Sequence, residues 1–148
     1  MSERTVFSMR AGRQTLRVLE EEARRYRVPP RTLAEDILEE GLKMRRHPGI
    51  VFVERGGGRD AVLAGRPRLS IWEVVLTARG SSSLAGAART LDLDVPSVER
   101  ALAYAADYPA EIEGAIEAND AAFERAKRLF PPALPAKSPR SRRAPSPR

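Results

Sequence analysis

The spacing of apolar residues predicts a helix over residues 13–26, preceded by a short strand. Apolar side chains recur every three or four positions on one face of this helix, at Leu16, Leu19, Ala23 and Tyr26. Residues 5–10, with the sequence TVFSMR, are extended in character and are soon followed by a glycine, which is typical of a single β-strand. The chain is therefore expected to begin with one strand and one helix.

A second helix is predicted to begin at Thr32. Pro29 and Pro30 end the first helix, and Thr32 with Glu35 forms the T-x-x-E pattern of a capping box. The apolar stripe of this helix consists of Leu33, Ile37, Leu38, Leu42 and Met44. The pattern ends before Pro48, so the helix is expected to end near residue 46.

The middle of the chain predicts a small hairpin followed by short helices. The apolar runs at residues 50–54 and 61–64 flank three consecutive glycines, as the strands of a β-hairpin flank its turn. Helices are expected over residues 71–78, from Ser82 or Ser83 through residue 91, and from Pro96 onward.

A last helix is predicted from Pro109 to about residue 130. One of its sides consists of Ile112, Ile116, Phe123 and Phe130. Residues 131–148 are rich in Pro, Ser and Arg, and they are expected to be disordered because they cannot bury a core. This tail carries five basic residues and no acid. It can contact DNA phosphates nonspecifically or serve only to raise solubility.

Composition argues against an enzyme. The 148 residues include no cysteine and a single histidine, His47, so thiol chemistry is excluded and few routes to acid–base or metal chemistry remain. We therefore expect no catalytic residue, no metal and no cofactor. No apolar run approaches the roughly 18 residues of a membrane span, and the N-terminus lacks an apolar signal region. A cytoplasmic protein without a membrane partner is expected.

The net charge of +6 is unevenly distributed along the chain. Residues 1–46 carry 11 basic and 8 acidic side chains, whereas residues 95–120 carry one basic side chain and six acids. Such blocks favour different partners in different parts of the chain, because a basic region attracts nucleic acid and an acidic region suits a basic protein.

The N-terminal elements predict a homodimer. One strand leaves its backbone groups unpaired, and two short helices bury little surface on their own. Antiparallel pairing of residues 5–10 from two copies satisfies the backbone and lets four helices share one core. Alternation along the strand assigns Phe7 and Met9 to the inner face. The dimer core is expected to consist of Phe7, Met9, Leu16, Leu19, Leu33 and Ile37.

The outer face of the paired strands is a candidate for binding double-stranded DNA, since a two-stranded ribbon fits the major groove. Arg10 is expected to donate hydrogen bonds to a guanine edge, beside weaker base contacts from Ser8 and Val6. Phosphate contacts are assigned to Arg13, Arg31 and Thr32, the last two at the start of the second helix. Two alternatives stay open: the strand serves only for dimerisation, and Thr32 serves only as a helix cap.

The N-terminal pattern resembles the MetJ/Arc/CopG ribbon-helix-helix family. The strand VFSMRA, the helix RQTLRVLEEEARRYR, the turn VPPR and the helix TLAEDILEEGLKM carry the resemblance over residues 5–44. Two features depart from the family: Pro29 and Pro30 stand in the turn, and Val6 is apolar where a polar reader is frequent. The resemblance implies a DNA-binding dimer.

A second resemblance covers residues 47–108, which are similar to the antitoxin-like domain-of-unknown-function family 433. The matching segments are the G-x-P turn GRP at residues 65–67, the helix IWEVV and the segment ALAYA at residues 101–105. The family's threonine and arginine after the turn are missing, because Arg68, Leu69 and Ser70 stand there. The resemblance implies a helix-turn-helix unit and pairing with a toxin protein, often one that cleaves RNA.

A partner surface is predicted in the acidic C-terminal half. Its candidate residues are Tyr104, Tyr108, Glu111, Glu113 and Phe123. The predicted helix from Pro96 carries one basic residue, so it suits a protein partner better than DNA. In the alternative interpretation, the aromatic side chains belong to the core and the acids form a solvated helix face.

Together these patterns predict a mainly α fold with minor β. The expected parts are a ribbon-helix-helix module (1–46), a small α+β domain of helix-turn-helix or winged-helix type (47–108), a C-terminal helix (109–130) and a disordered tail (131–148). The predicted function is a dimeric repressor of a toxin–antitoxin system, which binds operator DNA and, through its C-terminal half, a toxin. The alternatives are a regulator without a toxin and an interaction protein that does not bind DNA.

Overall fold

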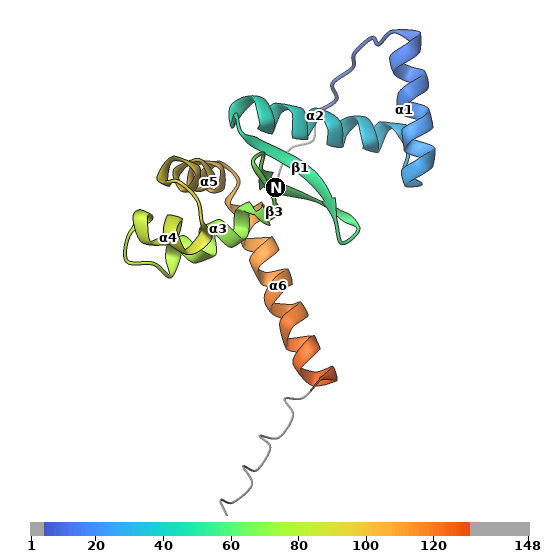
Figure 1. Cartoon of the computed structure of the whole chain (residues 1–148). Helices are drawn as coiled ribbons and strands as arrows, with labels where there is room; N and C mark the ends of the chain where they lie inside the picture. The colour runs from blue at the N-terminus through green and yellow to red at the C-terminus, as the bar shows by residue number, and fades with distance from the viewer. Residues whose placement is uncertain (1–4, 131–148) are drawn as a thin grey trace, which may run out of the picture.

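The computed structural model describes residues 5–130, which form six helices and one three-stranded antiparallel sheet. The helices are α1 (Arg13–Tyr26), α2 (Pro30–Arg46), α3 (Ile71–Arg79), α4 (Leu84–Leu91), α5 (Val95–Asp107) and α6 (Pro109–Leu129), and the strands are β1 (Ile50–Arg55), β2 (Gly58–Leu63) and β3 (Arg66–Ser70). In Figure 1, α2 lies over the sheet, α1 stands beside the far end of α2, and α6 projects away from the other elements. The disorder predicted for residues 131–148 lies outside the described residues.

The chain is mainly helical, but the expected N-terminal ribbon-helix-helix is wrong. Residues 5–12 form neither a strand nor a helix, and every strand of the described chain comes after α2. The physical reason is that a lone strand finds no partner for its backbone N–H and C=O groups within one chain. In place of a strand, a segment without regular structure leads into the helix pair α1–α2; we refer to residues 5–12 as the arm.

Helix α2 begins two residues earlier than the sequence predicted. Pro30 lies in its first turn, where a missing N–H leaves no intrahelical bond unmade, and Pro29 is the N-cap residue. Thr32 therefore lies inside the first turn and does not cap the helix. The side chain of Glu35 instead accepts a hydrogen bond of 2.9 Å from Arg31. The capping box predicted at Thr32 is wrong, because the prolines set the start of the helix.

The hairpin predicted around the three glycines is confirmed. β1 and β2 pair antiparallel with Arg55 opposite Gly58, which leaves Gly56 and Gly57 as the two turn residues. Their φ angles of +60° and +82° belong to the left-handed region, which suits a tight hairpin turn and favours glycine. Strand β3, which pairs with β2 on its other side, was missed in the sequence.

The starts of the later helices follow local capping signals. The hydroxyl of Ser83 accepts a hydrogen bond from the Gly86 amide at the start of α4. Asp94 caps α5 by accepting a hydrogen bond of 2.9 Å from the Ser97 amide. α6 begins at Pro109, as predicted. The sequence predicted these helices correctly because each start signal precedes a periodic apolar run.

The hydrophobic core lies between the sheet and helices α3–α6. Its largest fully buried side chains are Tyr104, Ile50, Ile71, Val62, Val74 and Val98. Ile112 and Ile116 add the first part of α6 to this core. Within residues 5–46, by contrast, only Ala23 is buried. The helix pair α1–α2 therefore lacks a core of its own. No helix of the described chain has both the length and the apolar character that crossing a bilayer requires.

Candidate functional site

The arm presents apolar and basic side chains to solvent. Val6 and Phe7 are 86% and 75% exposed, and Met9 is exposed as well. Between residues 5 and 17 the chain carries three exposed arginines, at positions 10, 13 and 17, and no acid. An apolar segment in this setting has no cover within the described chain, and its charge attracts anions.

The residues predicted for a dimer core do not close into one core in the single chain. Leu19 and Leu33 are half-buried, and the other four predicted core residues are exposed: Phe7, Met9, Leu16 and Ile37. Helices α1 and α2 carry five further exposed apolar side chains: Val18, Tyr26, Leu38, Leu42 and Met44. We call the exposed apolar side chains of the arm, α1 and α2 the N-terminal surface. No element of the described chain covers these side chains.

The predicted phosphate contacts divide between two places. Arg13 opens α1, and Arg17 lies one turn later on the same helix face, a spacing of four that the sequence analysis did not use. Arg31 lies at the start of α2, where its guanidinium forms an ion pair with Glu35. Pro30 has no N–H, so the first turn of α2 offers one amide donor fewer to an anion. Positive charge is thus concentrated at the arm and the start of α1.

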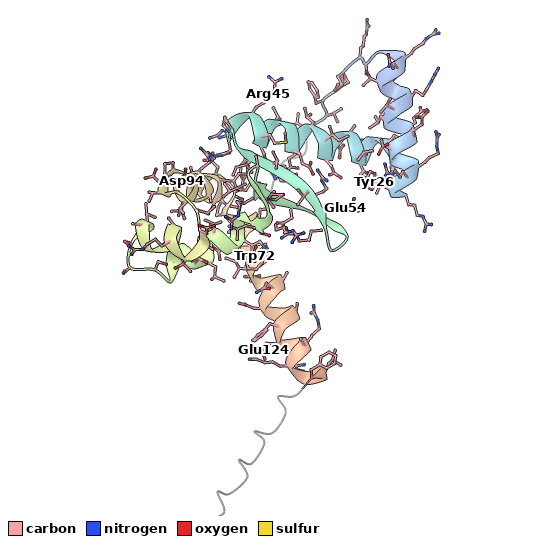
Figure 2. The ribbon with its side chains drawn as sticks, viewed as in Figure 1. Tyr26, Arg45, Glu54, Trp72, Asp94 and Glu124 are labelled. Atoms are coloured by element: carbon pink, nitrogen blue, oxygen red, sulfur yellow. The ribbon has the colours of Figure 1, made fainter. Side chains whose placement is uncertain are left out.

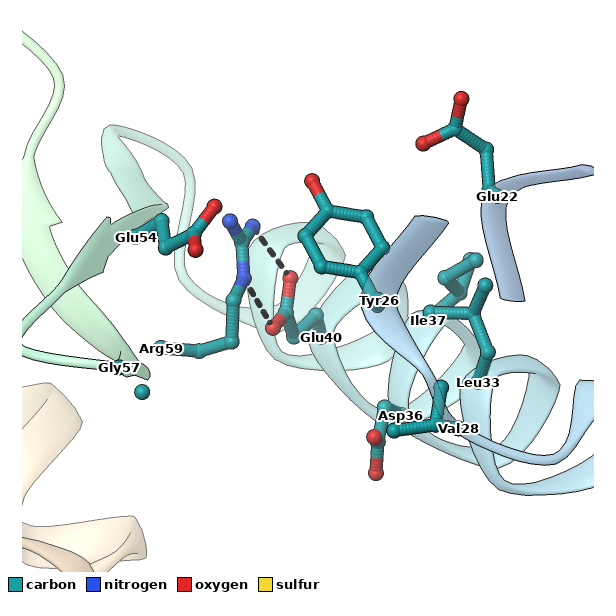
Figure 3. Close-up of a pocket in the computed structure, with 11 residues that line it drawn as sticks. Glu22, Tyr26, Val28, Leu33, Asp36, Ile37, Glu40, Glu54, Gly57 and Arg59 are labelled. Atoms are coloured by element: carbon teal, nitrogen blue, oxygen red, sulfur yellow. Dashed lines mark hydrogen bonds and ion pairs between the residues drawn. The ribbon is translucent and has the colours of Figure 1, made fainter. Parts of the chain in front are cut away.

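A groove of about 470 Å³ separates the helix pair from the tip of the hairpin (Figure 3). Its apolar lining comes from Tyr26, Val28, Leu33 and Ile37. Arg59 on β2 reaches Glu40 on α2 with two hydrogen bonds, of 2.8 and 2.9 Å, which tie the hairpin to α2. No sequence pattern signals this groove, because it depends on how the hairpin folds back under α2.

A cluster of polar side chains joins the end of α2 to α5 and α6. Lys43 donates a hydrogen bond of 2.7 Å to Glu111, and the Tyr104 hydroxyl donates one of 2.7 Å to the other oxygen of the same carboxylate. Nearby, Asp107 lies 2.7 Å from Arg46 and 2.9 Å from the Nε2 atom of His47. We call these six side chains the α2–α6 cluster.

The contacts of the α2–α6 cluster explain its shifted pKa values. Burial alone would lower the pKa of the Lys43 amine, but hydrogen bonds to Glu111 and Glu39 hold this pKa above its ordinary value. Burial raises the pKa of the Tyr104 hydroxyl, as does its bond to Glu111. The hydrogen bond from Arg46 lowers the pKa of Asp107, and His47 adds to this effect. At neutral pH, Lys43 and Asp107 are therefore charged and engaged with partners within the chain.

Of the residues predicted for a partner surface, Tyr104, Tyr108 and Glu111 lie together at the core, whereas Glu113 and Phe123 lie elsewhere on α6. Tyr104 is a core residue, Tyr108 is half-buried, and Glu111 is used within the α2–α6 cluster. Glu113 accepts hydrogen bonds from Arg79 on α3. Phe123 alone is both exposed and remote from the core. The alternative interpretation, in which an aromatic residue belongs to the core, holds for Tyr104.

Helices α4 and α5 are joined by a short turn in which Asp92 adopts a left-handed φ of 53°. The sole basic side chain of α5, Arg100, runs over Gly49, where an added Cβ atom would lie 3.0 Å from its Cδ atom. The start of α5 thus presents Asp94 and Glu99 rather than a basic face. DNA phosphates would be repelled there.

Comparison of the chain with models of protein families, with curated proteins and with solved structures found no match. The two resemblances drawn from the sequence therefore stay predictions, and the function is proposed from the residues themselves.

Proposed function

We propose that this protein is a dimeric, DNA-binding transcriptional repressor of the antitoxin type, assembled through the N-terminal surface. The observation that carries the proposal is the pairing, within residues 5–17, of exposed apolar side chains with three exposed arginines and no acid. Burying apolar surface contributes roughly 25 cal/mol per Å², so a second copy that covers it stabilises both chains. The arginines then remain outside the covered surface, where they can bind phosphates.

The arm supplies the contacts that distinguish DNA sequences. The exposed arm supplies side chains for both contacts: Phe7 and Met9 are available to the second copy, and Ser8 and Arg10 are available to DNA. The guanidinium of Arg10 is suited to the two acceptors of a guanine edge. Arg13 and Arg17 on α1, with Arg31 on α2, bind phosphates and position the protein.

DNA binding is tested by fluorescence anisotropy with two duplexes, one from the region upstream of the protein's own gene and one of scrambled sequence. Arg10→Ala is expected to weaken binding to the first duplex by about 10- to 100-fold and to leave the second nearly unchanged, as for a lost base contact. Arg89→Ala, at an exposed arginine of α4, is the matched control. Absence of any DNA affinity at low salt contradicts the proposal and favours an interaction protein that does not bind DNA.

The dimer is tested separately, by sedimentation equilibrium of the full chain. Ile37→Asp places a charge on the N-terminal surface and is expected to weaken its self-association by at least about tenfold, because a charge loses its hydration when covered. Leu76→Asp, at an exposed apolar residue of α3, is the control and leaves the assembly unchanged. Equal masses for the wild type and Ile37→Asp at all concentrations contradict a dimer through this surface.

A basic protein partner for the C-terminal half, such as a toxin, is the second part of the proposal. It is supported by the six acids and one basic residue between positions 95 and 120 and by the resemblance of residues 47–108 described above. The test is co-expression with the product of the neighbouring gene, followed by co-purification and by DNA binding with and without that product. If no neighbour co-purifies and DNA binding persists, a regulator without a toxin is favoured.

A further inference from the structure

The second half of α6 contributes no buried residue to the core. Every residue from 117 to 130 is exposed, and this part of the helix projects from the other elements (Figure 1). Glu124 lies on it, far from the sheet (Figure 2). We call residues 117–130 the distal segment. A helix of this length is marginal in water without tertiary packing, so it gains stability from any surface that covers it.

The distal segment carries an apolar stripe. Phe123, Ala126 and the C-cap residue Phe130 follow each other at spacings of three and four, so the stripe begins on one face of α6 and extends to the residue just after the helix. The side chains of Phe123 and Phe130 are 59% and 79% exposed. The amine of Lys127 lies 4.6 Å from the centre of the Phe123 ring and covers part of it. The stripe lies on the same face of α6 as the buried Ile116. This face is therefore buried in the core near Ile116 and exposed to solvent beyond it.

The charges of the distal segment are sorted along its length. Its acids, Glu117, Asp120 and Glu124, all precede its bases, Arg125, Lys127 and Arg128. An antiparallel copy of the same segment therefore places bases opposite acids at both ends, whereas a parallel copy places like charges together. Flanking charges of this kind set the orientation of paired helices. The segment is complementary to itself in the antiparallel orientation.

We propose that the distal segment of α6 pairs antiparallel with the distal segment of a second copy of this chain. At 1.5 Å per residue the segment is about 21 Å long, which is too short to bury the about 800 Å² per partner of a standard stable interface. Pairing is therefore weak on its own and gains strength when another contact already holds the copies together. If the N-terminal surface forms a dimer, as the proposed function requires, α6 pairing joins two such dimers and makes their DNA binding cooperative.

The test exchanges charges in the full chain. In a basic variant, Glu117, Asp120 and Glu124 are replaced by Lys; in an acidic variant, Arg125, Lys127 and Arg128 are replaced by Glu. Each variant alone is expected to weaken the α6-dependent association by about tenfold or more, because like charges then face each other. An equimolar mixture of the two restores the association between unlike chains. Sedimentation equilibrium gives the masses, and energy transfer between labelled chains shows which chains pair.

Further variants separate this pairing from the N-terminal dimer. Phe123→Glu removes the centre of the stripe, and Arg89→Glu on α4 is the control for an added surface charge. If both surfaces associate, Phe123→Glu reduces the assembly to dimers, and Phe123→Glu combined with Ile37→Asp gives monomers. If the distal segment is the only surface that associates, Phe123→Glu gives monomers even when Ile37 is unchanged. In both cases circular dichroism should show a folded chain, because the substituted residues contact nothing in the core.

Two outcomes overturn the inference. One is an unchanged association of the basic variant, the acidic variant and Phe123→Glu. The other is a mixture of the basic and acidic variants that associates no better than each variant alone. If Phe123→Glu leaves self-association intact but abolishes co-purification of the neighbouring gene product, the distal segment binds that protein rather than a second copy. This last result contradicts the α6 inference and leaves the proposed function standing.

Discussion

Lys43 and Glu111, 68 positions apart in the sequence, form a hydrogen-bonded ion pair of 2.7 Å between α2 and α6. The lysine side chain is only 13% exposed, so water screens the pair poorly. Glu111 also accepts the Tyr104 hydroxyl, and the amine of Lys43 lies over the Tyr108 ring. One carboxylate thus holds together the end of α2, the core tyrosine of α5 and the first turn of α6.

Removal of the charge of Glu111 should loosen the contact between α2 and the core. Glu111→Gln keeps the size of the side chain but leaves the amine of Lys43 in a half-buried site with Glu39 as its remaining carboxylate partner. We expect a loss of about 1–3 kcal/mol in the free energy of unfolding, the usual range for a buried hydrogen bond to a charged group. Urea unfolding followed by circular dichroism measures it. Glu117→Gln, on the exposed part of α6, is the control and should change this free energy by less than about 0.5 kcal/mol.

Stability should depend on Asp107 at acidic pH. Arg46 and then His47 lower the pKa of Asp107 in the folded chain below its ordinary value of 3.8. A carboxyl with a lowered folded pKa contributes stability above its unfolded pKa and loses that contribution as pH falls through the folded pKa. Asp107→Asn is therefore less stable than the wild type at neutral pH, and the difference narrows below about pH 3.8.

Thermal unfolding over a series of pH values tests this dependence. Asp94 and Glu113, whose pKa values are also lowered, remain in both proteins and cancel in the comparison. Asp92→Asn replaces a nearly fully exposed carboxylate and serves as the control. A difference in melting temperature between wild type and Asp107→Asn that stays constant down to the lowest pH would falsify the assignment of this pH-dependent stability to Asp107.

Ser70, the one serine in strands β1–β3, should be sensitive to substitution. Its buried hydroxyl donates a hydrogen bond of 2.6 Å to Asp60 and accepts one of 2.7 Å from Arg55, at the junction of β3 and α3. Ser70→Ala removes both bonds and is expected to cost about 1–3 kcal/mol of unfolding free energy. Ser82→Ala, at an exposed serine before α4, is the control. Equal urea midpoints for the two variants are incompatible with this role.

Gly49 is required by its backbone conformation and by its neighbour. Its φ of +93° is unfavourable for any residue with a Cβ atom, and that atom would lie 3.0 Å from Cδ of Arg100. We expect Gly49→Ala to lower the free energy of unfolding by about 1–2 kcal/mol. Gly65→Ala is the matched control, because an added Cβ there meets nothing within 4 Å. Similar melting temperatures for both variants contradict the prediction.

The sequence predicted those elements whose signals are local. Ser83, Pro96 and Pro109 mark helix starts that the structure contains, and the glycine turn marks the hairpin. The strand at residues 5–10 was predicted wrongly, because its hydrogen bonds depend on a second strand that a single chain lacks. β3 was missed because the arginines and proline of residues 66–70 give it no apolar alternation.

The candidate site was less predictable than the helices. The exposed arginines at positions 10, 13 and 17 follow directly from the sequence, because residues 5–17 contain no acid that could pair with them. Tyr104 was assigned to a partner surface, although its ring lies in the core, because one aromatic residue in an alanine-rich helix does not reveal which side is covered. Contacts such as Arg59 with Glu40 join separate elements, so no local pattern signals them.

Nearly all buried residues of the described chain lie in the sheet and helices α3–α6, and this distribution determines how fast different amides exchange protons with solvent. An amide exchanges when its hydrogen bond opens, and a segment with few buried contacts opens without the rest. The amide protons of α1, which has Ala23 as its one buried residue, should exchange well before those of α3 and α5. The amides of α3 and α5 exchange only when the core opens. Hydrogen exchange should therefore resolve at least two classes of amide in the isolated chain. If a partner covers α1, the amides of the fast class alone should exchange more slowly.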